Sequence, residues 1–165
     1  MTTAPRFARL FAFAAGFATL LAAADVAAQT AVPYPDGYRA WSHVKSMVIL
    51  PGHPLENPFA GIHHVYGNDK ALQGLASGAY ADGAVFVFDL LEGGVKDSAV
   101  VEGPRKLIGV MHRGATTYAA TGGWGFEGFA GDSRDKRLAA DGGKSCFACH
   151  EQRKDKAFVF TEARK

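Results

Sequence analysis

Two cysteines and a histidine near the C-terminus carry the clearest chemical signal in the sequence. Residues 146–150 read Cys-Phe-Ala-Cys-His, a C-x-x-C-H motif. Two thiols three residues apart on one turn can each add to a vinyl group of a porphyrin, and the adjacent histidine then lies beneath the iron as its proximal ligand. The motif predicts one haem c per chain, attached covalently through Cys146 and Cys149, with His150 as the iron ligand.

Three other interpretations of the motif explain less of it. A zinc site needs four ligands, and the sequence has no second C-x-x-C or H-x-x-x-H pair to complete a tetrahedron. A thioredoxin-like redox pair belongs at a helix start after an early strand, whereas this motif lies close to the C-terminus. A disulfide, the usual state of two cysteines in an exported protein, leaves the adjacent His150 without a role.

The N-terminal segment has the composition of a secretory signal. Arg6 and Arg9 precede an apolar run over residues 10–23, and the small residues 26–28 resemble the site that signal peptidase reads. The run is rich in alanine and shorter than the ~20 residues that a membrane-spanning helix needs, which argues against an uncleaved anchor. We expect residues 1–28 to be a cleaved signal peptide and the product to be periplasmic.

Residues 29–165 then form the mature domain. A chain of 165 residues is long enough for one domain with its own core, and the 18 basic and 16 acidic residues form no block of like charge. This balance predicts neither a nucleic-acid partner nor a membrane partner after signal cleavage.

Short strands separated by turns dominate the rest of the sequence. Residues 84–91 form the clearest of them, with Phe86 and Phe88 on one face, Val85 and Val87 on the other, and both faces buried. Further strands are expected at residues 61–66, 106–112, 123–129 and 157–161, and helices at 37–47, after the capping residue Asn68, and in part of 132–144. This order predicts an α+β fold, a twisted antiparallel β-sheet with a few packed helices and a C-terminal haem site.

Several segments, in order and at compatible spacing, resemble the cytochrome P-460 family, and within it the β-sheet cytochromes c′ (c′-beta). The segments lie at residues 38–41, 58–59, 62–66, 82–85, 123–126, 146–150 and 158–161, and read YRAW, PF, IHHVY, DGAV, GWGF, CFACH and FVFT. Each of them is short, but together they span nearly all of the mature chain.

The resemblance carries an expectation about the distal side of the haem. Enzymes of this family oxidise hydroxylamine with a haem cross-linked to a lysine five residues after the glycine that opens the strand, and here Gly83 plus five is Phe88. By resemblance Phe88 matches the aromatic cap of the cytochromes c′-beta, and Phe59 lies where a second distal phenylalanine is expected. Water and anions lose hydrogen bonds against such an apolar wall, whereas NO and CO lose little.

The function expected from these residues is a five-coordinate haem protein that binds NO, CO or a similar small gas, rather than an enzyme. One alternative is an oxidoreductase that acts on hydroxylamine or NO. The other is a six-coordinate electron-transfer cytochrome in which Met111, His63 or His64 supplies the sixth ligand. His63 and His64 are neighbours on one predicted strand, so at most one of them faces the haem. A redox partner is also expected, and the resemblance implies a homodimer.

Overall fold

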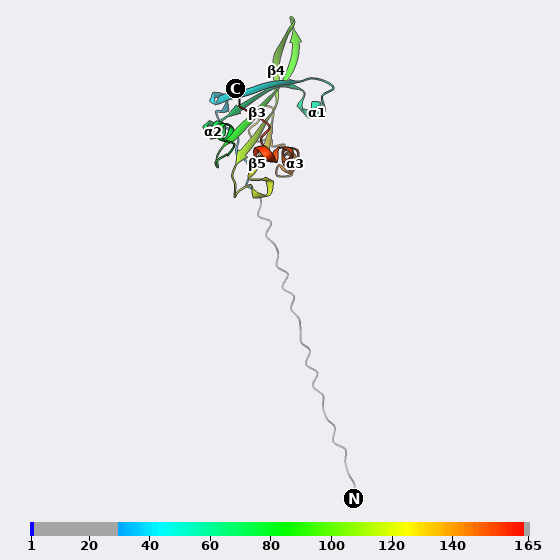
Figure 1. Ribbon diagram of the computed structural model, residues 1–165. Coiled ribbons are helices and arrows are strands. Elements are labelled where there is room, and N and C mark those ends of the chain that lie inside the picture. Colours follow the sequence, from blue (N-terminus) through cyan, green and yellow to red (C-terminus); the bar gives the residue numbers. More distant parts are fainter. Residues whose placement is uncertain (2–29, 164–165) are drawn as a thin grey trace.

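The described part of the computed structural model, residue 1 and residues 30–163, is built on one antiparallel sheet (Figure 1). The strands follow one another across the sheet in chain order, so each pairs with the next. They are β1 (Ser42–Ile49), β2 (Gly61–Gly67), β3 (Val85–Lys96), β4 (Ala99–Arg113) and β5 (Trp124–Ala130). The predicted α+β class with an antiparallel sheet is confirmed.

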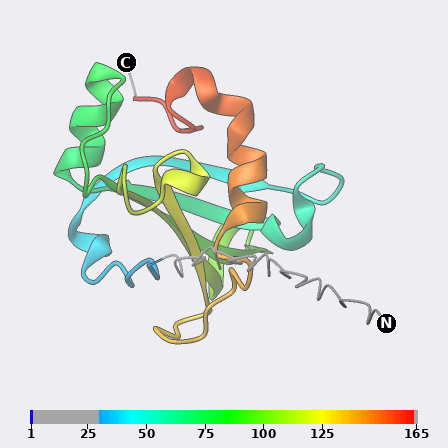
Figure 2. The ribbon, with the colours of Figure 1, turned by 90° about the horizontal axis from the view of Figure 1, so that it is seen from below.

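Short helical elements pack around this sheet. They are the α-helices α1 (Glu56–Phe59), α2 (Asp69–Ser77) and α3 (Lys144–His150) and the 3-10 turns η1 (Tyr38–Ala40), η2 (Ala119–Thr121) and η3 (Glu151–Lys156). Figure 2 shows α2 and α3 on one side of the sheet and the N-terminal part of the described chain, in blue, on the other. We call these two sides the helix face and the opposite face.

Each face of the sheet has its own apolar core, because successive side chains of a strand point to opposite faces. The core of the helix face contains Val44, Val65, Ala71, Ala84, Phe86, Met111, Trp124, Phe126 and Val159, with Phe88 and Cys146 packed against it. The core of the opposite face contains Val32, Tyr38, Val87, Ile108, Val110, Tyr118 and Phe129. The strand expected at residues 84–91 is therefore buried on both faces, as its sequence predicts.

Asn68 fixes the start of α2 to the start of β3. Its side-chain oxygen accepts from the backbone N–H of Ala71 at 3.0 Å, as predicted for a helix cap, and also from that of Val85 at 3.1 Å. Its side-chain nitrogen donates to the Gly83 carbonyl at 2.9 Å. One side chain thus holds the turn that leads into the strand of Phe88.

The helix expected at residues 37–47 is wrong. Tyr38–Ala40 form a single 3-10 turn, and residues 42–49 are the edge strand β1, paired antiparallel with β2. Tyr38 is buried in the opposite-face core, where its hydroxyl donates to the Asp89 carboxylate at 2.6 Å, and Val44 is buried in the helix-face core. The spacing of Tyr38 and Val44, which resembles that of a helix, therefore comes from burial on opposite faces of the sheet. The backbone hydrogen bonds of residues 42–49 are made with β2 and not within a helix.

Two expectations near the C-terminus are also wrong. Residues 132–143 form turns and one isolated bridge instead of a partial helix, and Gly142 and Gly143 adopt left-handed φ angles of 69° and 82° just before α3. The final segment, residues 157–161, contains no strand, because Ala157 and Phe158 have φ angles of 50° and 67° that turn the chain back on itself.

The expected signal peptide, residues 1–28, lies outside the described residues apart from Met1. Within the described part of the chain, no helix has the length and apolar character required to cross a membrane.

Candidate haem site

Helix α3 carries both cysteines and the histidine of the motif, and its first turn rests directly on β5. A Cβ added to Gly143, the residue before the helix, would lie 2.6 Å from the Phe126 carbonyl oxygen. Asp141, two residues before the N-cap residue Gly143, accepts from the N–H groups of Ser145 at 2.8 Å and Gly143 at 2.9 Å, and these bonds lower the pKa of its carboxyl group. The sequence before the motif thus sets where α3 lies on the sheet.

The two thiols lie one helical turn apart and differ in burial. Cys146 packs against the helix-face core, and burial raises the pKa of its thiol, whereas Cys149 is exposed. Both are free thiols. Side chains at positions i and i+3 of a helix lie on the same side of it, so both sulfurs can reach one porphyrin edge.

His150 is held in the form that binds a metal. Its Nδ1 lies 2.7 Å from the Phe158 carbonyl oxygen, which can only accept, so Nδ1 carries the proton and Nε2 keeps its lone pair. Burial also lowers the pKa of His150, which favours the neutral ring. A metal-bound histidine typically donates its other N–H to a carbonyl or carboxylate in this way.

The unusual backbone at Ala157 and Phe158 explains how that carbonyl reaches His150. Left-handed φ angles at two successive non-glycine residues are costly and persist only where surrounding contacts enforce them. The buried Trp124 supplies one such contact, because its indole N–H donates to the Ala157 carbonyl at 2.9 Å. The second contact is the Phe158 N–H, which donates to the Arg153 carbonyl at 2.7 Å. The strained backbone at Ala157 and Phe158 therefore belongs to the segment whose carbonyl orients His150, the expected iron ligand.

Phe59 and Phe88, the expected distal residues, lie together although they come from α1 and β3. Their ring centroids are 5.9 Å apart in an edge-to-face arrangement. Phe88 lies over Gly109, its partner on β4, where an added Cβ would come within 3.2 Å of the Phe88 ring. The glycine lets the ring lie low against the sheet, on the face that also carries α3.

In the described structure, the expected distal residues and the C-x-x-C-H motif are connected only through the helix-face core that lies between them. Phe88 and Cys146 pack against the same helix-face core. Among the described residues, the rings in contact with His150 are those of Phe126 and Phe160, with centroids at 4.8 Å and 5.1 Å, and not those of Phe59 or Phe88.

The three alternative sixth ligands have different surroundings. Met111 is buried in the helix-face core. His64 points to the opposite face, where its Nδ1 bonds with the Ser46 hydroxyl and its Nε2 with the Glu102 carboxylate. His63 is buried beside Phe88, with ring centroids 4.4 Å apart. As the alternation of a strand predicts, only one of the two histidines faces the helix face.

Sequence reasoning missed the residues that support the site. The Phe158 carbonyl, the Trp124 indole and the glycine beneath Phe88 act through backbone geometry and long-range contacts, which no local motif encodes. The one available signal was the run of glycines and aromatics over residues 122–129, which indicates close backbone approach without naming what approaches.

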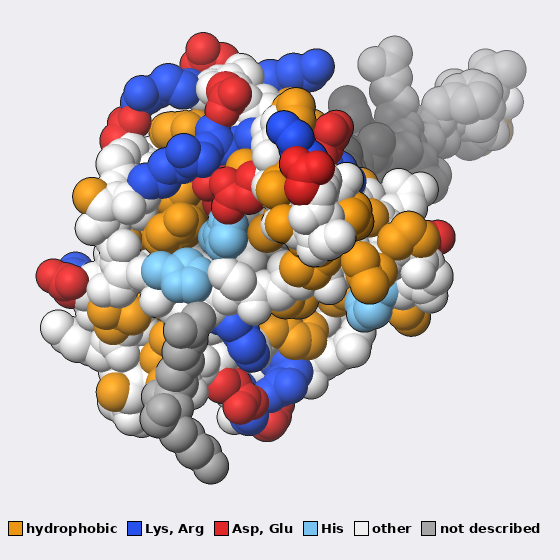
Figure 3. Space-filling model, turned by 90° about the horizontal axis from the view of Figure 1, so that it is seen from above, with side chains coloured by type: hydrophobic (Ala, Val, Ile, Leu, Met, Phe, Trp, Pro, Cys, Tyr) orange, Lys and Arg blue, Asp and Glu red, His pale blue; other side chains and the backbone are white. Residues whose placement is uncertain are grey.

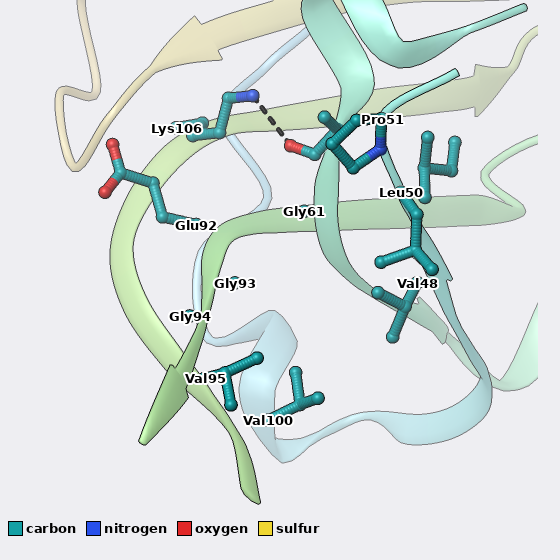
Figure 4. Close-up of a pocket in the computed structure, with 12 residues that line it drawn as sticks. Val48, Leu50, Pro51, Gly61, Glu92, Gly93, Gly94, Val95, Val100 and Lys106 are labelled. Carbon is teal, nitrogen blue, oxygen red and sulfur yellow. Dashed lines mark hydrogen bonds between the residues drawn. The ribbon is translucent and has the colours of Figure 1, made fainter. Parts of the chain in front are cut away.

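A hollow of about 340 Å³ lies elsewhere, between the end of β1 and the extended hairpin of β3 and β4 (Figure 4). Its walls are mostly apolar, and Val48, Val95 and Val100 point toward it. None of the motif residues lines it. This hollow is therefore separate from the candidate haem site.

The donor set of α3 fits a c-type haem, since two free thiols one turn apart and one imidazole with a free Nε2 are the groups that such a haem requires. No curated protein matches the chain. The family model for cytochrome P460 matches residues 35–161, which include both strand faces and all three motif residues. The chain therefore belongs to the cytochrome P460 family, which indicates a haem-binding cytochrome.

Proposed function

We propose that this protein is an exported cytochrome with one covalent haem c, five-coordinate through His150, that binds NO or a similar small gas. The observation that carries the proposal is Phe88. This phenylalanine is in edge contact with Phe59 at 5.9 Å, and by the family resemblance it takes the place of the lysine that forms the cross-link in the lysine-bearing relatives. It can offer the iron neither a ligand nor a hydrogen bond.

Residues on the proximal and distal sides of the haem have different roles in this proposal. On the proximal side, the Phe158 carbonyl orients His150 and keeps its Nε2 available. On the distal side, Phe59 and Phe88 exclude water and anions, because these would lose hydrogen bonds that hydrocarbon cannot replace. The haem, when bound, supplies the iron to which a neutral diatomic gas can bind. Selectivity then follows from desolvation and steric access.

A six-coordinate electron-transfer cytochrome remains the second candidate, and one observation favours it. The Nδ1 of His63 is buried and has no hydrogen-bond partner among the described residues, and a free imidazole nitrogen can bind iron. The oxidoreductase alternative lacks such support, since Phe88 cannot form the lysine cross-link.

One optical experiment separates these candidates. We expect the reduced protein to show a five-coordinate high-spin spectrum that changes when NO or CO is added. A low-spin six-coordinate spectrum that does not change when either gas is added would favour electron transfer, and a red-shifted chromophore would favour the cross-linked oxidoreductase.

We further propose that the protein is a homodimer and exchanges electrons with a separate redox partner. The extended hairpin of β3 and β4, visible at the top of Figure 1, supports the dimer because it carries exposed valines, with Val95 79% and Val100 58% exposed. Seen from above, this end of the molecule mixes hydrophobic side chains with charged ones (Figure 3), and exposed apolar surface of this kind is typical of interfaces.

The dimer and the export proposal have simple tests. Sedimentation of the holoprotein should give twice the monomer mass, and Val95→Lys with Val100→Lys should give the monomer; a monomeric wild type would refute the dimer. The periplasmic protein should begin within a residue or two of Gln29. A mature chain that began at Met1 would refute cleavage.

A further inference from the structure

His63 contacts both phenylalanines of the proposed distal wall. It sits on β2 with 1% of its surface exposed, as deeply buried as Asp89 and Thr121 elsewhere in the chain. Its ring and that of Phe88 are in edge-to-face contact, with a centroid distance of 4.4 Å and an interplanar angle of 88°. Its Nε2 lies 2.5 Å from the backbone carbonyl oxygen of Phe59. One side chain therefore contacts both aromatic residues.

The hydrogen bond determines the protonation state of His63. A carbonyl oxygen can only accept, so Nε2 carries the proton and donates it. A second proton on Nδ1 would be buried without an acceptor among the described residues, which is costly. Burial, together with the nearby Lys106, His53 and His64, lowers the pKa of His63. The ring is therefore neutral, with Nε2–H as its donor.

The backbone that carries Phe59 is anchored at two consecutive carbonyls. His63 binds the Phe59 carbonyl, and the Lys106 ammonium donates to the Ala60 carbonyl at 2.7 Å (Figure 4). The next residue is Gly61, where φ is 134° and an added Cβ would lie 2.1 Å from the Leu91 carbonyl oxygen. Lys106 and Gly61 fix where the chain enters β2, and His63 adds a second link from this corner to Phe88 beside the direct contact of the Phe59 and Phe88 rings.

We propose that His63 is a positioning residue of the distal wall: its Nε2–H holds the backbone of Phe59, its ring holds Phe88, and together these two contacts set how fast small gases reach the iron. This inference rests on the proposed function. It differs from a role as sixth iron ligand, because it assigns the function of His63 to the hydrogen bond of Nε2 and to the ring contact with Phe88, with no bond from Nδ1 to iron.

A matched pair of substitutions isolates the donor. In His63→Gln the side-chain amide reaches about as far as Nε2 and can still donate to Phe59, whereas in His63→Asn the amide reaches only the position of Nδ1. Both variants are polar and similar in size, so both face a similar burial cost. His64→Gln, on the other face of the same strand, is the control for a change on β2 that does not touch the wall.

The test is stopped-flow binding of CO and NO to the reduced holoproteins, with thermal melting used to check folding. We expect His63→Asn to bind the gases roughly tenfold faster than the wild type, because it loses one hydrogen bond that holds the distal wall closed. The binding rates of His63→Gln and His64→Gln should stay within about threefold of the wild-type rate. If the wild type binds both gases but the Gln and Asn variants of His63 bind them at equal rates, the positioning role is overturned.

The same experiment separates failure of the inference from failure of the proposed function. A wild type that binds neither gas would refute the proposed function itself. A low-spin wild type that became high-spin in both His63 variants would show that His63 is an iron ligand, and would overturn the positioning role. Nitrogen-15 NMR of the diamagnetic CO complex should find a proton on Nε2 of His63, and a proton on Nδ1 would contradict the anchor.

Discussion

A phenylalanine in place of a lysine changes two properties at one position of the proposed pocket. Phe88 has no amine to react with a haem, and its ring adds bulk and hydrocarbon where a charged chain would attract water. The ring is supported from below by Gly109 and from the side by His63. The specificity proposed for this protein therefore depends on a side chain whose position several neighbours fix.

Phe88→Ala should open the distal side. Removal of the ring should let water reach the ferric iron, so that the spectrum becomes at least partly six-coordinate, and CO association should rise about tenfold or more, the equivalent of about 1.4 kcal/mol in barrier. Phe59→Ala should act in the same direction and more weakly, because Phe59 is held mainly through its backbone. Stopped-flow rates and a ferric spectrum that match the wild type in both variants would leave Phe88 as a core residue only.

At the scale of the elements, β3 carries the distal phenylalanine on one face and a buried ion-pair network on the other. Asp89 is 1% exposed and accepts from Tyr38 at 2.6 Å and from the Arg105 Nε at 2.7 Å. Burial alone would raise the pKa of Asp89, but these hydrogen bonds and the nearby charges of Arg105 and Arg39 hold that pKa below its usual value. The network ties η1 and β4 to the strand that presents Phe88.

Asp89→Ala should destabilise the fold by about 3 kcal/mol, because it removes the buried partner of Arg105, which then keeps only the exposed Asp132, and leaves the Tyr38 hydroxyl without its acceptor. Urea denaturation of the holoprotein measures this loss. Asp155→Asn is the matched control, since its carboxylate is 69% exposed and lies 3.9 Å from Arg153, and it should change the midpoint little. Equal stability of the two variants would show that the network does not hold β3.

The elements that the sequence predicts well are those whose signal is local. The alternation of residues 84–91 and the cap at Asn68 are each contained in a few neighbouring residues, and both are confirmed. The helix expected at 37–47 failed because burial of Tyr38 depends on Asp89, fifty-one positions away. The turn at Phe158 could not be predicted either, because it depends on contacts with Trp124 and His150, which lie outside the turn itself.

For the molecule as a whole, buried histidines make stability depend on pH. Burial is the largest cause that lowers the pKa of both His63 and His112. Below the ordinary histidine pKa of about 6.5, the unfolded chain therefore binds more protons than the folded one. Their contribution to stability is complete above that pH and is lost as the pH falls through the lower folded pKa values.

The denaturation midpoint should therefore be flat from about pH 8 to 7 and fall as the solution is acidified toward pH 5. The double variant His63→Gln, His112→Gln should be less stable near neutral pH but lose less on acidification. His43→Gln, at an exposed position, should follow the wild-type curve. A double variant with the wild-type slope would assign the acid sensitivity to other groups.

The covalent attachment of haem at α3 can be measured directly by the intact mass of the mature protein. We expect the polypeptide plus one haem, resistant to acid extraction, and loss of that added mass in the double variant Cys146→Ala, Cys149→Ala. A mature protein with the bare polypeptide mass, less the two hydrogens of a Cys146–Cys149 disulfide, would contradict the haem site and with it the proposed function.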